Sequence, residues 1–490
     1  MANTIPAFDF DNTFARELEG LYTPAAAANF PAPKLVLRNE GLAKELGLDL
    51  DELQGDAAAR VFAGTTLPEG ATPIAQAYAG HQFGGFSPQL GDGRALLLGE
   101  VVDVHGHRRD IQLKGSGPTG FSRGGDGKAS LGPVLREYLF GEAMHALGIP
   151  TTRVLGVATT GEDIYRERAL PGAVLARVAS SHIRVGTFQF FAARRRDEEL
   201  RRLADYTIAR HLPDAQSADN PYLALLDAVA ERQAQLTAKW MNVGFIHGVM
   251  NTDNVSIAGE TIDYGPCAFM DEYDPTTVFS SIDRNGRYAY GNQPPIARWN
   301  IARLAEALLP LLAPDIDEAV GMAEKTIEAF VPAYQEAWLS GMRAKLGLSE
   351  PDGEDPALAE DLLKVMQGVD FTSAFRKLGV AARGETAPFL ELFSEDAVEA
   401  WLERWQARVA QEGHDAEKVA ASMDATNPAY IPRNHKTEEA LDAAVDGGDL
   451  EPFKALLAAV RNPYDEKDSL ADYAGPAPSD FGPFQTFCGT

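Results

Sequence analysis

Two nearby segments, residues 247–254 and 263–265, carry side chains whose types and spacing suit metal and phosphate chemistry. The first reads His-Gly-Val-Met-Asn-Thr-Asp-Asn and the second reads Asp-Tyr-Gly. Asn254 and Asp263 offer oxygen atoms of the kind that Mg²⁺ prefers, and Asp253 is a carboxylate that can accept a proton. The two segments therefore predict a site that handles a magnesium–nucleotide complex.

The order of these residues follows the pattern of kinase-type enzymes with one change. Those enzymes use His-x-Asp, an Asn about five positions after that Asp, and then Asp-Phe-Gly. Asn254 and Asp263 occupy the two metal-binding positions, but Val249 stands where the catalytic Asp belongs and can neither orient nor deprotonate a hydroxyl. Asp253 is the only carboxylate of this loop that could take over, the alternative being that it only supports or caps the loop.

A glycine-rich turn at residues 90–94 precedes a strand expected over 95–104. Glycines in such a turn let backbone N–H groups approach phosphates closely. A single Gly-x-Gly is weak support by itself, because most such pairs are ordinary turns.

Lys114 and Glu137 are predicted to form a buried ion pair. Lys114 ends an alternating strand over 110–114, and Glu137 lies in a helix expected over 133–147 that is apolar on nearly every side. A buried carboxylate without a partner costs several kcal/mol, so Glu137 needs a cation, and Lys114 is the natural choice. The alternative is that both residues are solvated.

The composition limits the classes of partner. The 490 residues include 71 acidic and 44 basic side chains, which gives a formal net charge of −27. Such a surface repels polyanions, so nucleic acid and anionic membranes are poor partners. No apolar run approaches the ~20 residues of a membrane span, the first residues lack the features of a secretory or transit peptide, and two cysteines exclude a disulfide framework. We expect a cytoplasmic enzyme.

Motifs along most of the chain resemble those of the selenoprotein O family, pseudokinases that act as protein adenylyltransferases. The matching segments are 79–86 (AGHQFGGF), 112–117 (QLKGSG), 121–126 (FSRGGD), 180–186 (SSHIRVG), 247–254 (HGVMNTDN) and 427–435 (NPAYIPRNH). Because they occur over most of the sequence, the resemblance is specific and global.

The resemblance implies that ATP binds in reversed orientation and that AMP, rather than phosphate, is transferred to Ser, Thr or Tyr hydroxyls of proteins, the enzyme itself included. Asp253 is then the proton acceptor, and Asn254 and Asp263 hold Mg²⁺, with Mn²⁺ as a possible substitute. The residues expected to contact or position the nucleotide are Gly91, Gly93, Arg94, Lys114, Glu137, Asp126, Gly127, Arg177, Arg184 and Asp263.

The resemblance also implies an α+β, protein-kinase-like two-lobed fold with extensions at both ends. We expect an N-terminal extension over 1–75, a kinase-like N-lobe over 76–180 and a C-lobe with the catalytic and metal-binding loops over 181–346. A helical C-terminal extension with a flexible tail is expected over 347–490. A chain of this length is too long for one compact core, which favours such a division.

Two pairs of residues carry further expectations. Arg177 and Arg184 are seven positions apart, close to two helical turns, so on a helix they could clamp phosphates, although they could also be surface residues. Many family members end in a redox pair, whereas this chain ends with the single thiol of Cys488. We hypothesise a reversible disulfide between Cys267 and Cys488; the alternative is a buried Cys267 and an unimportant exposed Cys488.

Two other functions stay open at this stage. A small-molecule or protein phosphotransferase would need an Asp where Val249 stands. A non-catalytic nucleotide-binding pseudokinase scaffold would have no need of both Asn254 and Asp263.

Overall fold

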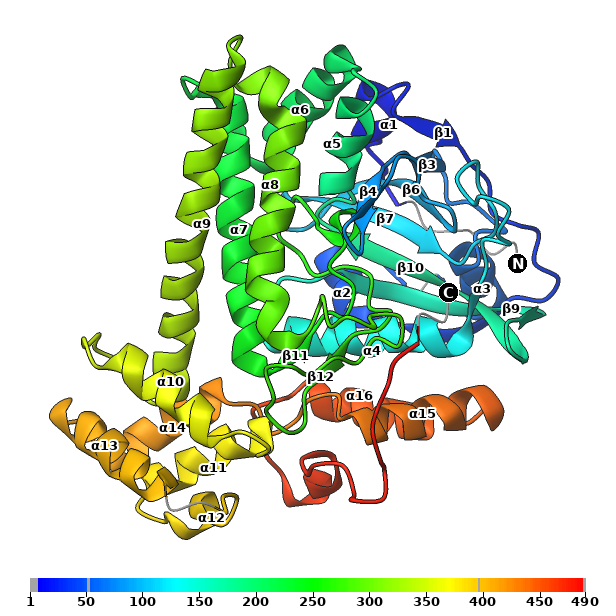
Figure 1. Ribbon diagram of the computed structural model, residues 1–490. Helices are drawn as coiled ribbons and strands as arrows, with labels where there is room; N and C mark the ends of the chain where they lie inside the picture. Colours follow the sequence, from blue (N-terminus) through cyan, green and yellow to red (C-terminus); the bar gives the residue numbers. More distant parts are fainter. Residues whose placement is uncertain (1–7, 51–52, 395–396, 488–490) are drawn as a thin grey trace.

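The computed structural model describes residues 8–50, 53–394 and 397–487. They form an N-lobe built on a sheet and a C-lobe built on long helices, with a further group of helices packed along the lower side of both in Figure 1. The α+β class expected from the sequence is confirmed.

The N-lobe strands form one antiparallel sheet. They are β1 (Tyr22–Pro24), β2 (Lys34–Arg38), β3 (Ile74–Gln76), β6 (Ala95–Val102), β7 (Arg108–Lys114), β8 (Ala129–Ser130), β9 (Arg153–Tyr165) and β10 (Ala169–Ala179). The order is β1-β3-β6-β7-β10-β9-β2, and β8 pairs with β10. The strands expected over 95–104 and 110–114 are thus present as β6 and β7, and β1 and β2 bring part of the first 75 residues into the same sheet.

Both faces of this sheet are covered, which explains why β6 begins with an apolar run over residues 95–98. Leu97 faces the core shared with α4 (Leu131–Ala146), while Leu96 and Leu98 face a second core beneath α3 (Gly55–Phe62). Successive strand residues point to opposite faces, so a run of leucines fills both cores. The helix expected over 133–147 is α4, which begins two residues earlier than predicted.

The C-lobe centres on three long helices that pack against one another (Figure 1). Its helices are α5 (Val185–Ala192), α6 (Asp197–His211), α7 (Pro221–Val243), α8 (Gln293–Leu312) and α9 (Ile316–Lys345). Local sequence fixes the ends of α7: the Asn220 side chain caps its start, and Gly244 ends it with φ +72°, a backbone conformation that glycine adopts without a steric penalty. No helix in the described ranges combines the length and apolar character that a membrane span requires.

The C-terminal helices serve two different parts of the molecule. They are α10 (Asp355–Val365), α11 (Phe371–Ala382), α12 (Ala387–Leu390), α13 (Ala397–Gln411), α14 (Ala416–Thr426), α15 (Asn434–Asp446) and α16 (Glu451–Val460). The first five pack around a core that contains Trp401 and Trp405 and that they share with C-lobe residues such as Met241 and Met342. The last two pack on α4 (Figure 1), where Arg461 pairs with Glu142 at 2.8 Å. The extension therefore supports the helix that carries Glu137.

Short elements complete the fold around the loops. They are α1 (Thr13–Glu17), α2 (Glu40–Glu45), the hairpin β4 (Gly80–Gln82) and β5 (Gly85–Ser87), and the pair β11 (Phe245–Ile246) and β12 (Ala268–Phe269). Strands β11 and β12 flank the loops that carry Asp253 and Asp263, and pair with each other.

Candidate active site

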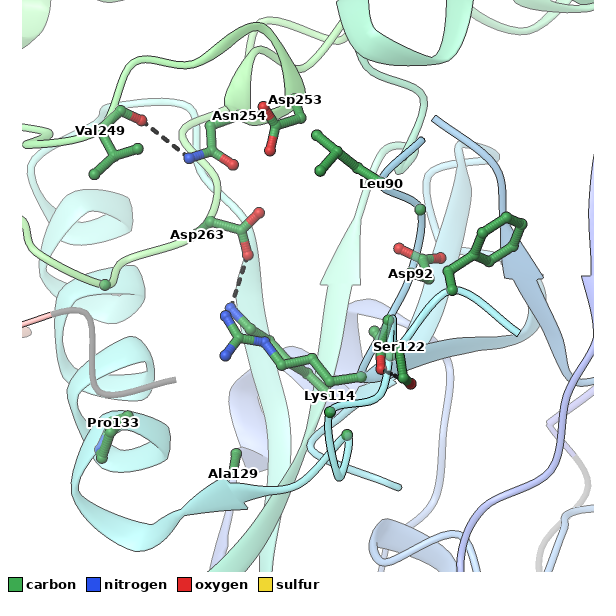
Figure 2. Close-up of a pocket in the computed structure, with 18 of the residues that line it drawn as sticks. Leu90, Asp92, Lys114, Ser122, Ala129, Pro133, Val249, Asp253, Asn254 and Asp263 are labelled. Carbon is green, nitrogen blue, oxygen red and sulfur yellow. Dashed lines mark hydrogen bonds and ion pairs between the residues drawn. The ribbon is translucent and has the colours of Figure 1, made fainter. Parts of the chain in front are cut away.

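A cavity of about 680 Å³ lies where the two lobes meet (Figure 2). The N-lobe side is formed by the turn at 90–95, the end of β7, the loop over 121–129 and α4, and the C-lobe side by residues from 249–254 and 263–266. Every candidate site residue predicted from the sequence lines this cavity. In Figure 2 the side chains of Asp253, Asn254 and Asp263 gather at one side, across from Asp92.

Asp253 lies in a short 3₁₀ turn over Thr252–Asn254 and is almost fully buried. Its Oδ2 accepts a hydrogen bond from Gln82 Nε2 at 3.2 Å, whereas its Oδ1 has no hydrogen-bond partner among the described residues. Burial raises the pKa of this carboxyl to about 6. A carboxyl that lines a cavity and has a pKa near neutrality is suited to accept a proton at physiological pH.

Backbone contacts hold the rest of this loop in place. Asn254 Nδ2 donates to the Val249 carbonyl at 3.0 Å, so the amide oxygen is the end left for a ligand. His247 is buried, and one of its ring nitrogens lies 2.9 Å from the carbonyl of Ile262, just before Asp263. The His of the motif thus ties the two loops together, and the apolar Val249 side chain lines the cavity at the usual base position.

Asp263 is surrounded by three cations. Its Oδ1 accepts from Lys114 Nζ and from Arg177 Nη1, both at 2.7 Å, and its Oδ2 accepts from Arg184 Nη1 at 2.7 Å. Burial alone raises the pKa of Asp263, but the charges of the three cations outweigh it and hold the pKa well below its usual value. Asp263 is therefore ionised, and its backbone is left-handed at φ +64°.

The expected ion pair between Lys114 and Glu137 is present, at 2.6 Å. Glu137 also lies 3.2 Å from Arg177, so two cations share it. Burial raises the pKa of Glu137, and the charges of Lys114 and Arg177 outweigh that effect and lower it. Both members of the pair are buried, so the alternative of two solvated residues is wrong.

The helical interpretation of Arg177 and Arg184 is wrong. Arg177 lies in β10, and Arg184 directly precedes α5, so a strand end and a turn separate them rather than two helical turns. Residues 173–178 form a central strand buried on both faces, which overrides any helical spacing. Both arginines are buried, so they are not surface residues either; they approach each other because each binds Asp263.

The glycines at 91 and 93 make room for a loop. A Cβ on Gly91 would lie 2.4 Å from the Phe121 ring, and a Cβ on Gly93 would lie 2.9 Å from the Phe121 carbonyl oxygen. Gly91 also has φ +87°. The glycine-rich turn therefore lets the loop over 121–129 close onto it, and Arg94 lines the cavity beside this contact.

Asp126 and Gly127 lie in that loop, at the edge of the cavity. Asp126 pairs with Arg166 at 2.8 Å, and these hydrogen bonds lower its pKa. Gly127 has φ +66°, and a Cβ there would lie 2.2 Å from the carbonyl oxygen of Gly117. The ion pair between Asp126 and Arg166 therefore ties this loop to the turn between β9 and β10.

Sequence reasoning missed two polar residues of the site. Asp92 is buried, and its Oδ2 accepts from Gln76 N–H and Gln112 Nε2, both at 3.1 Å. Burial raises its pKa to about 6. The position of Asp92 between two glycines was a usable signal. The other is Tyr78, whose ring lies 4.8 Å from the Arg184 guanidinium. No feature of the sequence around Tyr78 pointed to the site.

The donor set fits a hard divalent cation that is held jointly with phosphates. Asn254 and Asp263 provide an amide and a carboxylate oxygen, and the side chain of Asp253 lies on the same side of the cavity (Figure 2). Mg²⁺ is commonly bound by one or two such groups, with phosphate and water oxygens completing its shell. Among the described residues, no group of three or more His, Cys, Asp or Glu side chains is arranged to hold a metal ion by itself, and binding shared with phosphates does not require one.

Of the two cysteines, the structure describes Cys267. Cys267 is a free, fully buried thiol, and burial raises its pKa to about 12. Cys488 lies outside the described residues, so the disulfide stays a prediction. Thr486 is buried and donates to the carbonyl of Pro266 at 2.8 Å, which brings the tail beside the segment that carries Cys267.

Comparison with known proteins agrees with this geometry. The family model of protein adenylyltransferase SelO matches residues 5–461. A protein nucleotidyltransferase YdiU of Cereibacter sphaeroides is 60% identical over 99% of this chain and 100% of its own length. Proteins of the same name from Agrobacterium fabrum and Methylorubrum extorquens are 56% and 58% identical, over 98% and 99% of this chain and 99% of each relative.

These comparisons confirm the predicted resemblance and, with it, the kinase-like fold and the class of enzyme, a nucleotidyltransferase. They match the chain almost from end to end, so the similarity does not stop at the nucleotide site. The chain belongs to the protein adenylyltransferase SelO family.

Proposed function

We propose that this protein transfers AMP from ATP to hydroxyl groups of protein side chains, in a Mg²⁺-dependent reaction that releases pyrophosphate. The observation that carries the proposal is the carboxyl of Asp253, which is largely buried, lines the cavity and has a pKa of about 6. It lies in a loop where Val249 replaces the usual kinase base. The names of the family and of the relatives support nucleotidyl rather than phosphoryl transfer.

In the proposed reaction, the carboxylate of Asp253 takes the proton of a Ser, Thr or Tyr hydroxyl as that oxygen attacks the α-phosphorus of ATP. The bond from the α-phosphorus to the bridging oxygen breaks, and pyrophosphate leaves with the electron pair. Arg177 and Arg184 provide fixed positive charge for the phosphates. Because both are already held by Asp263, they need little reorganisation.

The nucleotide is proposed to lie in reversed orientation, with its phosphates near the three cations. Asn254 and Asp263 would hold Mg²⁺, or Mn²⁺ in its place, and such an ion would supply Lewis-acid polarisation of phosphate oxygens. The support is that all the proposed contacts line one cavity. The proposed nucleotide contacts are Gly91, Gly93, Arg94, Lys114, Asp126, Gly127, Arg177 and Arg184, with Glu137 positioning Lys114.

The acceptors are proposed to be cytoplasmic proteins, with self-modification as a side reaction and with no role for nucleic acid or membranes. The net charge of −27 supports the exclusion of polyanions. The division into an extension over 1–75, lobes over 76–180 and 181–346 and an extension over 347–490 is part of the same proposal.

Incubation with ATP labelled separately at the α- and γ-phosphates tests the reaction. We expect α-label to enter acceptor proteins and the enzyme in the presence of Mg²⁺, and γ-label to leave as pyrophosphate. Incorporation of γ-label at comparable yield would refute adenylyl transfer and favour a phosphotransferase. Binding of ATP with no incorporation of either label would favour a non-catalytic scaffold.

A further inference from the structure

The hairpin of β4 and β5 lies directly against the catalytic loop, although none of the steps at the nucleotide needs it. Backbone N–H groups of His81 and Phe83 donate to the side chains of Thr252 and Asn251, at 2.7 and 3.1 Å. The glutamine between them donates to Asp253. Whatever binds to this hairpin is therefore held beside the carboxylate of Asp253.

The turn of the hairpin holds a phenylalanine in an unfavourable conformation. Phe83 has φ +51° and Gly84 has φ +86°. Two-residue hairpin turns with both φ values positive favour Asn-Gly, because a bulky side chain is strained there. Phe83 is 37% exposed and its ring lies 5.1 Å from that of Tyr288. A strained residue that displays an aromatic ring next to a reactive group indicates a binding function.

Further apolar side chains extend this exposed surface. Phe86, at the other end of the turn, is 43% exposed, and Ile282 is 50% exposed. Phe83 and Ile282 line the cavity, and the Phe86 ring lies 4.9 Å from that of His81. His81 in turn meets Trp299 edge to face at 5.3 Å. Exposed apolar groups gathered at the rim of a site are typical of a surface that receives a partner.

Two arginines give the same surface a positive charge. The guanidinium groups of Arg287 and Arg303 lie 4.8 and 5.0 Å from the Trp299 ring. Arg303 pairs with Glu306, whereas Arg287 forms no ion pair with any carboxylate in the described parts of the chain. A Cβ on Gly84 would lie 3.6 Å from the Arg287 guanidinium, so the basic and aromatic parts are continuous.

We propose that this surface docks the protein substrate, by binding an acidic segment that carries an apolar side chain next to the modified hydroxyl. The residues of this docking surface are His81, Phe83, Phe86, Arg287, Trp299 and Arg303. The inference rests on the proposed adenylyl transfer and adds the class of acceptor to it.

Charge complementarity is the reason for choosing an acidic segment. The protein as a whole carries a net charge of −27 and repels acidic partners at long range, so an unpaired arginine at the rim gives such a segment a local site. The cations that face the nucleotide are a different set, already shared between Glu137 and Asp263. Arg287 is free to bind carboxylates of the acceptor.

Three peptide pools test the proposal, each with a central position that is Ser, Thr or Tyr and with Leu and Phe nearby. The remaining positions are Asp and Glu in the first pool, Lys and Arg in the second, and Asn and Gln in the third. The assay measures AMP incorporated from α-labelled ATP. We expect kcat/KM for the acidic pool to exceed that for the basic pool by about tenfold or more.

Matched variants identify the surface. Arg287→Glu is expected to lower kcat/KM for the acidic pool about tenfold, to shift the preference toward the basic pool, and to leave ATP affinity unchanged. Arg60→Glu, at an exposed arginine of α3 that forms no ion pair among the described residues, is the charge-matched control and leaves the preference as it is. Phe86→Ala raises the KM of the acidic pool, whereas Leu67→Ala, equally exposed at 43%, does not.

The outcomes separate the docking proposal from the proposed function. Equal labelling of the three pools, or an unchanged preference in Arg287→Glu, overturns the docking surface and leaves adenylyl transfer standing. Preferential entry of γ-label into the acidic pool overturns adenylyl transfer and leaves the docking surface standing. If only whole proteins accept AMP, equal labelling of them by wild type and Arg287→Glu overturns the docking surface.

Discussion

Replacing Asp253 with Asn is expected to abolish transfer while stabilising the fold at neutral pH. The carboxyl has a pKa of about 6 instead of the usual 3.8, because burial penalises its ionised form. This difference corresponds to about 3 kcal/mol of destabilisation once Asp253 is ionised. Asn has nearly the same shape and never ionises, so Asp253→Asn escapes that cost and cannot accept a proton.

The pH dependence has a definite sign. The pKa of Asp253 is higher in the folded state than in the unfolded state, so folding is favoured at low pH, and this contribution is lost as pH rises from about 4 through 6. With 490 residues and about 2.1 cal/mol/K per residue, the entropy of unfolding is about 1 kcal/mol/K, so 3 kcal/mol corresponds to about 3 °C in Tm. The Tm of Asp253→Asn is thus expected to exceed that of wild type by about 3 °C at pH 8 and to match it at pH 4.

Calorimetry from pH 4 to 8 measures this difference, and transfer of α-label measures activity in the same samples. For wild type, kcat/KM is expected to fall about tenfold per pH unit below pH 6, as the base becomes protonated. Asp219→Asn, at an exposed carboxylate, controls for the chemical change. Near wild-type turnover in Asp253→Asn would refute the role as base, and a Tm difference independent of pH would refute the desolvated carboxyl.

Three other changes have expected outcomes. Asp263→Ala is expected to abolish both transfer and most Mg²⁺-dependent ATP binding, as isothermal titration with and without Mg²⁺ will show; retained Mg²⁺-dependent binding would contradict the metal role. Gly91→Ala should lower Tm and transfer strongly, because its Cβ would lie 2.4 Å from the phenyl ring that covers it, whereas Gly124→Ala, also at positive φ but with nothing within 4 Å, is the matched control with a smaller effect. After mild oxidation, non-reducing mass spectrometry should find a peptide that links Cys267 to Cys488, and its absence would remove the disulfide hypothesis.

Local motifs predicted much of the site. The loop with Asp253 and Asn254, the second loop with Asp263, and the pair of Lys114 with Glu137 all line one cavity. They could be predicted because each depends on a short spacing or on a simple rule, that a buried carboxylate needs a partner. The strands β6 and β7 were likewise visible as apolar or alternating runs, of which β6 begins after the glycine turn and β7 ends at Lys114.

The features of the site that could not be predicted from the sequence depend on contacts between distant segments. Arg177 and Arg184 meet only because β10 and the turn before α5 both approach Asp263, about 80 residues later in the chain. Spacing along the chain carries no information about such a meeting, and it suggested a helix where the sheet required a strand. The contact between the β4–β5 hairpin and the catalytic loop is equally long-range.

The position of the base bears on how the nucleotide must lie. In Figure 2, Val249 at the usual kinase base position and Asp253, the proposed base, lie on opposite sides of Asn254. The proposed base therefore lies on the other side of a proposed metal ligand from the usual kinase base. In the proposed reaction, the hydroxyl that Asp253 deprotonates would therefore approach the nucleotide from the side of the β4–β5 hairpin, which is hydrogen-bonded to Asp253. A reversed nucleotide would present its α-phosphorus to that approach, while its β- and γ-phosphates occupy other positions. The loss of the kinase base and the exposed aromatic hairpin are then two parts of one arrangement, because the relocated base needs an acceptor delivered to its own side.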